Sequence, residues 1–317
     1  MSGYVIVFPG QGAQEVGMGR DFRDAYAVSR DAFDEADEAL GFALSKIIFE
    51  GQEDELTKTA VAQPAILAAS VAILRAVEQE FGGELCPKFY AGHSLGEYTA
   101  LVASGVLSLG DAARLVRKRG ALMQEAVPLG EGAMAAVMGL DMAAVSEICA
   151  TAAGDEVCGP ANVNSPNQIV ISGNAAAVAR AGEMAKVRGA SRVIPLKVSA
   201  PFHCALMRPV ADKLMEAFAA CEWNEPKAPI TANADASAKN SADAIKAALY
   251  EQTYKPVLWA DGVLSMTSAG AERFAEFGPG SVLSGLIKRT AKGVPALSVN
   301  KVTDIGKALD FLNGAAR

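Results

Sequence analysis

The stretch FYAGHSLGEY, residues 89–98, places a serine between two glycines where an apolar run meets a helix-like segment. KFYAG (88–92) predicts a short buried strand, and LGEYTALVASG (95–105) predicts a helix closed by its last glycine. A serine on such a turn has an exposed hydroxyl, and helix N-terminal amides nearby can stabilise an oxyanion. This context favours Ser94 as a nucleophile, while an ordinary helix start capped by Ser94 is the structural alternative.

The segments around this turn predict a parallel α/β domain. YVIVF (4–8) is a buried-strand run that ends in the turn PGQG, and VAQPAILAASVAILRAVEQEFG (61–82) is a long apolar helix with Pro64 near its start. Strands therefore alternate with helices, which indicates a parallel sheet covered by helices.

The middle of the chain has a different order of elements. Strands are predicted at 132–140, 156–163, 167–173 and 191–198, and helices at 141–152 and 175–189. This βαββαβ order is that of a split-βαβ, ferredoxin-like unit. We therefore expect a small subdomain at 127–198, inserted into a larger domain made of 1–126 and 199–317. The polar segment NADASAKNSADA (233–244) predicts a loose connection.

Composition excludes several classes of protein. The 317 residues are 51% hydrophobic, which suits one large or two modest domains. The beginning of the chain lacks a basic segment followed by a long apolar one, and no uninterrupted apolar stretch reaches roughly 18 residues. The net charge of -7 argues against a nucleic-acid-binding protein. The five cysteines are scattered without a CxxC pair, so neither a disulfide framework nor a zinc site is expected, and a reducing cytoplasm fits best.

A serine nucleophile needs a general base, and the chain has only two histidines. His93 adjoins the serine, and neighbouring side chains on a turn usually diverge. His203, in SAPFHCALM, follows a predicted strand and the Pro201 turn. A lone histidine is more often structural, but beside a bracketed serine and without a rival base His203 is the candidate.

Arg119 lies on the apolar side of a predicted helix at 111–126, four residues after Leu115. The apolar stripe consists of Ala112, Leu115, Val116, Leu122, Met123 and Ala126. An inward guanidinium is costly unless an anion meets it, and its fork suits a carboxylate. The residues alone leave a protein carboxylate and a substrate carboxylate equally open as its partner.

Six motifs carry a resemblance that runs over nearly the whole chain. They are FPGQGAQ (8–14), QPAIL (63–67), GHSLGEY (92–98), ANVNSPNQIVISG (161–173), APFH (200–203) and FGPG (277–280). Their order resembles that of malonyl-CoA:acyl carrier protein transacylases, of the free-standing, bacterial type. The resemblance implies an α/β-hydrolase-like large domain with a parallel sheet and an inserted ferredoxin-like subdomain. A dinucleotide-binding turn at GQGAQE is disfavoured, because Glu15 stands where the third glycine belongs.

The resemblance also implies catalytic roles. Ser94 would be the acylated nucleophile and His203 its general base and acid. The backbone amides of Gln11 and Leu95 would form the oxyanion hole. In this family a glutamine or a backbone carbonyl, rather than an aspartate, orients the imidazole, and the glutamine position matches Gln252. An ordinary polar residue at a helix end is the alternative for Gln252.

Further positions concern the substrate. By the resemblance, Arg119 clamps the free carboxylate of a malonyl group, and Gln63 and Asn162 match residues near the active site. Phe202 is similar to the aromatic residue of malonyl-selective members. His93 either contacts the substrate or has a structural role.

The implied reaction is a two-step acyl transfer that supplies fatty acid synthesis. Ser94 takes malonyl from coenzyme A, and the pantetheine thiol of an acyl carrier protein takes it from the serine. No metal or bound cofactor, no nucleic acid and no membrane are expected, and we expect a cytoplasmic monomer. The acidic carrier protein would dock on one of two basic clusters, Arg114, Arg117 and Lys118 or Lys288, Arg289 and Lys292. A serine thioesterase or hydrolase is the alternative enzyme, and a non-catalytic carrier-binding subunit is the alternative outside catalysis.

Overall fold

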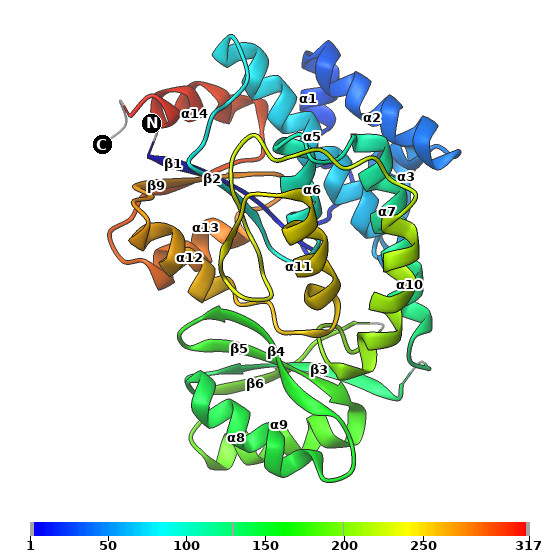
Figure 1. Cartoon of the computed structure of the whole chain (residues 1–317), viewed down its shortest axis with the longest axis vertical. Coiled ribbons are helices and arrows are strands. Elements are labelled where there is room, and N and C mark those ends of the chain that lie inside the picture. The colour runs from blue at the N-terminus through cyan, green and yellow to red at the C-terminus, as the bar shows by residue number, and fades with distance from the viewer. Residues whose placement is uncertain (1–2, 129, 199, 315–317) are drawn as a thin grey trace.

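Two β-sheets organise the chain in the computed structural model, which describes residues 3–128, 130–198 and 200–314 (Figure 1). The larger sheet contains β1 (Tyr4–Phe8), β2 (Phe89–Gly92), β7 (Ile230–Thr231), β8 (Ala238–Lys239), β9 (Arg273–Phe277) and β10 (Ala296–Val299). Its order is β10-β9-β1-β2-β7-β8, and all pairs are parallel except β7 with β8. The parallel α/β domain predicted from the sequence is confirmed at this level.

The central strand β1 faces two different helical layers. Tyr4, Ile6 and Phe8 join one apolar core, while Val5 and Val7 join another. This period of two is what a pleated strand imposes, and burial of both faces explains why the strand is apolar throughout. Because Phe8 pairs with Gly92 at the carboxyl ends of β1 and β2, the loops that follow these strands meet at one edge.

Helices cover both faces of the larger sheet (Figure 1). They are α1 (Arg20–Ala25), α2 (Ala27–Leu40), α3 (Leu44–Glu50), α4 (Glu53–Leu56), α5 (Thr59–Phe81), α6 (Leu95–Ala103), α7 (Leu109–Glu125), α10 (Arg208–Phe218), α11 (Ala242–Tyr254), α12 (Trp259–Ser268), α13 (Val282–Thr290) and α14 (Ile305–Leu312), with 3-10 turns at Ala205–Met207 and Val302–Asp304. α5 is long and apolar enough to cross a bilayer, but 83% of its most apolar window is buried inside the protein. Its composition is that of a core helix, packed between α2, α6 and α7.

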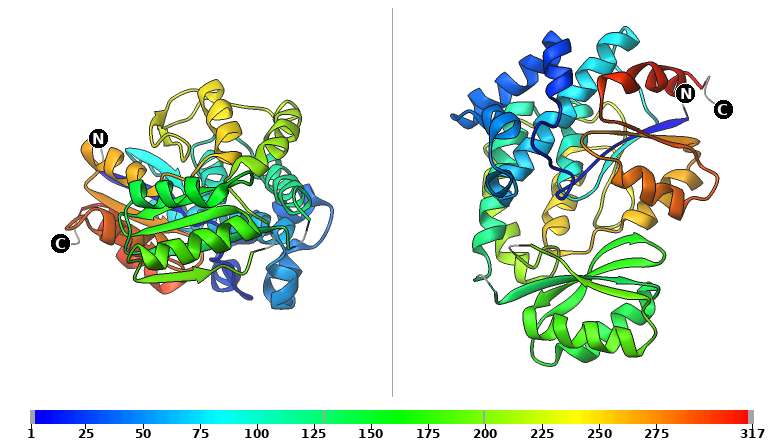
Figure 2. Two further views of the ribbon diagram at one scale, coloured as in Figure 1. Left: turned by 90° about the horizontal axis from the view of Figure 1, so that it is seen from below. Right: turned by 180° about the vertical axis from the view of Figure 1, so that it is seen from behind.

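The smaller sheet contains β3 (Gly132–Met138), β4 (Cys158–Ser165), β5 (Gln168–Asn174) and β6 (Arg192–Pro195), in the antiparallel order β4-β5-β3-β6. α8 (Met142–Ala153) and α9 (Ala175–Val187) lie on the face away from the larger sheet (Figure 2). The predicted βαββαβ order is confirmed. Val257 connects the chain between α11 and α12 to strand β4 of the smaller sheet. Its amide donates to Ala161 O at 2.8 Å, and its carbonyl accepts from Val163 N at 2.8 Å.

The prediction of a loose connection at 233–244 is wrong. Asn233 is buried, β8 pairs with β7, and α11 begins at Ala242 with the Ser241 hydroxyl as its cap. The Asn233 side chain instead donates to Gly92 O inside the protein, and the Ser241 hydroxyl accepts from Ala244 N at the start of α11.

Candidate active site

Ser94 lies on a strained turn between β2 and α6, with φ 52° and ψ −103°. Non-glycine residues rarely adopt a positive φ, and such strain is concentrated at functional sites. The flanking glycines are required by close packing. A Cβ on Gly92 would lie 1.9 Å from the carbonyl carbon of Gly96, and a Cβ on Gly96 would lie 2.1 Å from Phe8 O. The glycines therefore let the helix start against the strand ends, which raises the serine above the sheet edge.

Asn233 fastens this turn, and sequence reasoning missed it. Its Oδ1 accepts from Ser94 N at 2.7 Å, and its Nδ2 donates to Gly92 O at 2.8 Å. The backbone N–H of Asn233 donates to the Glu97 carboxylate at 3.0 Å. The serine and this asparagine are 139 positions apart, so no local pattern marks the pair.

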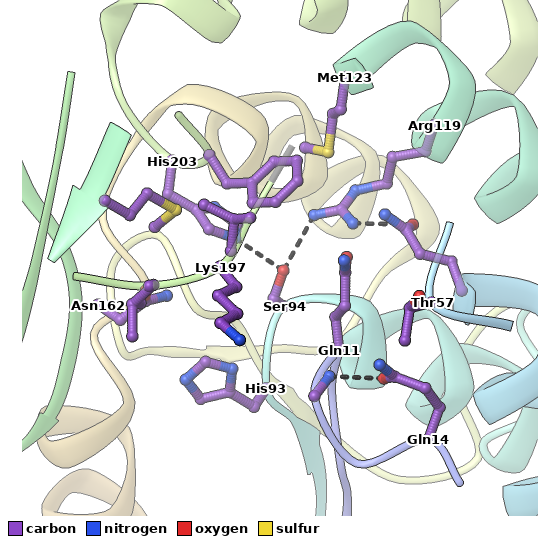
Figure 3. Close-up of a pocket in the computed structure, with 16 residues that line it drawn as sticks. Gln11, Gln14, Thr57, His93, Ser94, Arg119, Met123, Asn162, Lys197 and His203 are labelled. Carbon is purple, nitrogen blue, oxygen red and sulfur yellow. Dashed lines mark hydrogen bonds between the residues drawn. The ribbon is translucent and has the colours of Figure 1, made fainter. Parts of the chain in front are cut away.

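The Ser94 hydroxyl and the His203 imidazole form a nucleophile and base pair (Figure 3). Ser94 Oγ lies 2.7 Å from His203 Nε2, and His203 Nδ1 lies 2.8 Å from the main-chain oxygen of Gln252. A carbonyl oxygen only accepts, so Nδ1 carries the proton and Nε2 presents its lone pair to the serine. Burial, with the Arg119 charge, lowers the pKa of His203 to about 3, so the imidazole is neutral at pH 7.

Gln252 orients the imidazole through its backbone, not its side chain. The buried side chain donates from Nε2 to Ser94 O at 2.8 Å and to Glu97 Oε2 at 3.0 Å. Its Oε1 accepts from Arg119 Nη2 at 2.9 Å. The side-chain amide therefore ties the serine turn to the arginine.

Arg119 is 1% exposed, and its guanidinium reaches the nucleophile from α7. Nη1 donates to Gln63 Oε1 at 3.0 Å, and Nη2 donates to Ser94 Oγ at 3.1 Å. Within the described ranges Arg119 forms no ion pair, so no protein carboxylate contacts the guanidinium directly. Burial lowers the pKa of Arg119, but a guanidinium stays protonated in proteins. A buried, unpaired cation beside a nucleophile is suited to an anionic acyl group.

A pocket of about 380 Å³ opens over the serine between the two sheets' domains. Its lining residues are Gln11, Gly12, Gln14, Thr57, Gln63, His93, Ser94, Arg119, Met123, Met134, Asn162, Leu196, Lys197, Val198, Phe202 and His203. Of the eight predicted site residues other than Ser94 and His203, six line this pocket, and Leu95 and Gln252 do not. The six are Gln11, Gln63, His93, Arg119, Asn162 and Phe202.

No sequence pattern marks the wall of the pocket that Leu196, Lys197 and Val198 form. The predicted strand at 191–198 is shorter in the structure, because β6 ends at Pro195 and the chain then crosses the pocket. In the view of Figure 3 the Lys197 side chain extends from beside Ser94 toward the His93 ring.

The two amides predicted for an oxyanion hole lie on adjoining loops. Leu95 is the first residue of α6, and Gln11 follows β1. Neither backbone N–H donates a hydrogen bond within the part of the chain that the structure describes. The loops are in contact, since a Cβ on Gly10 would lie 2.4 Å from His93 O. Both amides are thus available to a ligand at the edge of the sheet.

The remaining candidates line the pocket with different restraints. His93 Nε2 contacts Asn164 Oδ1 at 2.8 Å, and the His93 ring packs 5.8 Å from Trp259. Burial lowers the pKa of His93, so this ring too is neutral. Asn162 is buried on β4, whereas Phe202 is partly buried against the apolar cores. Among the described residues no three His, Cys, Asp or Glu side chains cluster as a metal site requires.

Comparisons with known proteins agree with this geometry. A family model described as the acyl transferase domain matches residues 5–308. The malonyl CoA-acyl carrier protein transacylase of Escherichia coli strain K12 is 47% identical over 311 residues, which cover 98% of this chain and 100% of the relative. The crystal structure of an acyl carrier protein S-malonyltransferase from Vibrio cholerae is 48% identical, with a TM-score of 0.94 over 97% of this chain and 100% of that one. A malonyl-transacylase solved in complex with its type II PKS acyl-carrier protein is 46% identical, with a TM-score of 0.93 over 97% of this chain and 99% of that one.

Proposed function

The chain belongs to the acyl transferase domain family, and we infer that it transfers a malonyl group from coenzyme A to the thiol of an acyl carrier protein. The reaction supplies fatty acid synthesis and passes through a malonyl-serine intermediate. One observation carries the assignment to this chain's residues: the buried, unpaired Arg119 guanidinium donates to the same hydroxyl that faces His203. A nucleophile, a neutral base and a cation for the malonyl carboxylate then converge on one pocket.

In the first step Ser94 Oγ attacks the thioester carbonyl while His203 Nε2 takes the hydroxyl proton. The amides of Gln11 and Leu95 stabilise the tetrahedral oxyanion, and each such donor is worth about 100- to 1,000-fold in rate in comparable enzymes. The carbon–sulfur bond then breaks, and His203 returns the proton to the departing thiolate. Coenzyme A leaves, and malonate remains as an ester on Ser94.

In the second step the carrier protein's pantetheine thiol gives its proton to His203 and attacks the ester. The carbon–oxygen bond breaks, and Ser94 recovers the proton. A neutral carbonyl, that of Gln252, holds the imidazole instead of a carboxylate, which stabilises the imidazolium less. Thioester chemistry tolerates this, because a thiolate is a good leaving group.

Arg119 and Gln63 select malonyl over uncharged acyl groups. The guanidinium supplies positive charge and N–H donors to the free carboxylate, and the Gln63 side-chain oxygen Oε1 holds it in place by accepting from Nη1 at 3.0 Å. Phe202 and Met123 limit the space beside the acyl group. Gln252, Asn162 and His93 support the site around these contacts.

The finer description of the fold follows from the same proposal. Residues 1–126 and 199–317 form an α/β-hydrolase-like catalytic domain, which is supported by the serine turn at the carboxyl end of a parallel strand. Residues 127–198 form a ferredoxin-like insertion, which the strand order β4-β5-β3-β6 and the position of α8 and α9 on one face support. We propose these boundaries as the sequence predicts them.

Carrier-protein docking involves the second basic cluster rather than the first. Arg114 is paired with Asp111 at 2.6 Å, and Arg117 stacks 4.2 Å from the Phe42 ring. Lys288 and Arg289 lie in the last turn of α13 and form no ion pair within the described ranges. The enzyme acts as a cytoplasmic monomer with no metal or resident cofactor, and coenzyme A is a product.

Intact-protein mass after brief exposure to malonyl-CoA tests this function. The expected result is one malonyl adduct, absent in Ser94→Ala and present in Ser108→Ala, which changes a serine at the start of α7 outside the pocket. The adduct should disappear when carrier protein bearing the pantetheine thiol is added. A thioesterase would instead release malonate without an acceptor, and an adduct on Ser94→Ala would exclude the assigned nucleophile.

A further inference from the structure

A carboxylate that the proposed mechanism does not use lies beneath the serine turn. Glu97, the third residue of α6, is 1% exposed and has no ion-pair partner within the described part of the chain. Its Oε2 accepts from the backbone N–H of Asn233 and from Gln252 Nε2, each at 3.0 Å. The N-terminal turn of α6 also favours negative charge. An ionised carboxylate without a direct cation is expensive to bury, so its protonation state must be sensitive to nearby charge.

Gln252 connects this carboxylate to the substrate-binding cation. Its amide nitrogen donates to Glu97 at 3.0 Å, and its amide oxygen accepts from Arg119 Nη2 at 2.9 Å. Asn233 makes a second connection, since it bonds to both Glu97 and Ser94 N. The charge of Glu97 therefore acts on the arginine through the Gln252 side chain, and on the nucleophile's turn through Asn233, whose backbone N–H bonds to Glu97 and whose side chain bonds to Ser94 N.

Within the described residues, the titratable groups around Glu97 and Arg119 do not provide another counterion. His93 and His203 are neutral because burial lowers the pKa of both. Asp235, in the hairpin facing α6, adds negative charge but is paired with Lys239 at 2.5 Å. Glu251 on α11 pairs at 2.6 Å with Lys255, the residue that follows the helix. On α6 itself burial raises the pKa of the Tyr98 phenol to about 12, so the phenol stays uncharged.

Binding of malonate thus places two carboxylates around one buried cation. Burial raises the pKa of Glu97 to about 7, against the opposing effects of its hydrogen bonds from Gln252 and Asn233 and of the Arg119 charge. A second anion on Arg119 must raise it further, because the attraction that held Glu97 ionised is then shared.

We propose that Glu97 is a positioning residue that takes up a proton when the malonyl carboxylate engages Arg119. This inference rests on the proposed function. Protonation keeps the buried site near neutrality and preserves the Glu97, Gln252 and Arg119 chain in its observed geometry. An acetyl group carries no carboxylate, so acetyl transfer requires no proton uptake. Selectivity for malonyl is then dependent on pH.

The direction and size of the effect follow from linkage. If malonate raises the Glu97 pKa from about 7 by one unit, malonyl affinity falls about sevenfold between pH 6 and pH 8.5. Acetyl affinity does not change over that range. At pH 7.5 the same shift corresponds to uptake of about half a proton per malonyl adduct.

The experiment counts protons with an indicator dye in weakly buffered wild-type enzyme at pH 7.5, while intact mass counts adducts. Malonyl-CoA and acetyl-CoA are compared because both release the same coenzyme A thiol, so the protons that this thiol binds or releases cancel in the difference. Glu97→Gln keeps an acceptor for both hydrogen bonds but cannot ionise, and should form the adduct without uptake. Glu216→Gln, an exposed carboxylate on α10, should behave as wild type.

Each outcome decides the matter. Malonyl-specific uptake that Glu97→Gln abolishes supports the inference; a full adduct without uptake, or equal uptake with acetyl-CoA, overturns it. Should Glu97→Gln fail to fold, the wild-type ratio of malonyl to acetyl acylation rates serves alone, and a ratio constant from pH 6 to pH 8.5 overturns the inference. Absence of any malonyl adduct would refute the proposed function, and this inference with it.

Discussion

Replacement of Arg119 by alanine should change which acyl group the enzyme accepts. Arg119 is 1% exposed, and its guanidinium donates to oxygens of Gln63, Gln252 and Ser94, with the Tyr98 ring 5.4 Å from its central carbon. Truncating one partner of a buried, hydrogen-bonded charge pair costs about 2–5 kcal/mol. A loss of about 3 kcal/mol is on the order of a hundredfold in the rate of malonyl acylation.

The assay is single-turnover acylation, with malonyl-CoA and acetyl-CoA competing in one tube and both adducts resolved by mass. The malonyl-to-acetyl ratio should fall on the order of a hundredfold in Arg119→Ala. Arg119→Lys keeps the positive charge but lacks the planar pair of donors, so its malonyl-to-acetyl ratio should lie between those of the wild type and Arg119→Ala. Arg117→Ala, two residues away over the Phe42 ring, is the matched control. Equal loss of malonyl and acetyl acylation in Arg119→Ala would refute the reasoning, because the arginine would then serve only the serine.

Three further predictions concern the base and the turn. The pKa of His203 in the folded protein lies near 3, below its usual value, so the base stays unprotonated as the pH falls from 8 to 5. The rate of acetyl acylation should therefore be constant over that range. A fall in this rate centred near pH 6.5 would contradict the prediction. Asn233→Ala removes the hydrogen bonds to Ser94 N and Gly92 O and should lower the free energy of unfolding, measured by urea denaturation, by about 1–3 kcal/mol. The exposed Asn240→Ala should leave that free energy unchanged. Equal effects of the two substitutions would argue against a role of Asn233 in holding the serine turn. Gly96→Ala places a Cβ 2.1 Å from Phe8 O and should prevent recovery of folded protein, while Gly306→Ala in α14 meets nothing within 4 Å and should fold normally by circular dichroism; a folded, active Gly96→Ala would contradict the close approach.

Elements with a strong repeat were predictable from sequence. Short runs of apolar residues predict the strands at 4–8 and 89–92, and the hydrophobic periodicity of neighbouring residues predicts the βαββαβ order of the middle segment. Arg119 was found in the same way, since a cation on an apolar helical face conflicts with its surroundings. Such signals are local, and so they survive in a single sequence.

Contacts between distant segments were not predictable. Asn233 lies in a segment whose polar composition suggested a loose loop, yet its side chain closes the serine turn. The sequence marks Glu97 only as a member of the GHSLGEY motif, whereas its burial and its hydrogen bond from Gln252 make it part of the charged network in the structure. The imidazole is held by a main-chain oxygen of Gln252, and a backbone atom leaves no residue-specific mark in the sequence.

The central claim is that the acyl group on Ser94 goes to a thiol rather than to water. The direct measurement isolates the malonyl-enzyme, divides it between buffer and buffer containing carrier protein with its pantetheine thiol, and follows the enzyme's mass with time. The account predicts an adduct that persists in buffer and is discharged by the carrier protein, with malonyl appearing on the carrier thiol. Rapid loss of the adduct in buffer alone, with free malonate as the product in both arms, would contradict it.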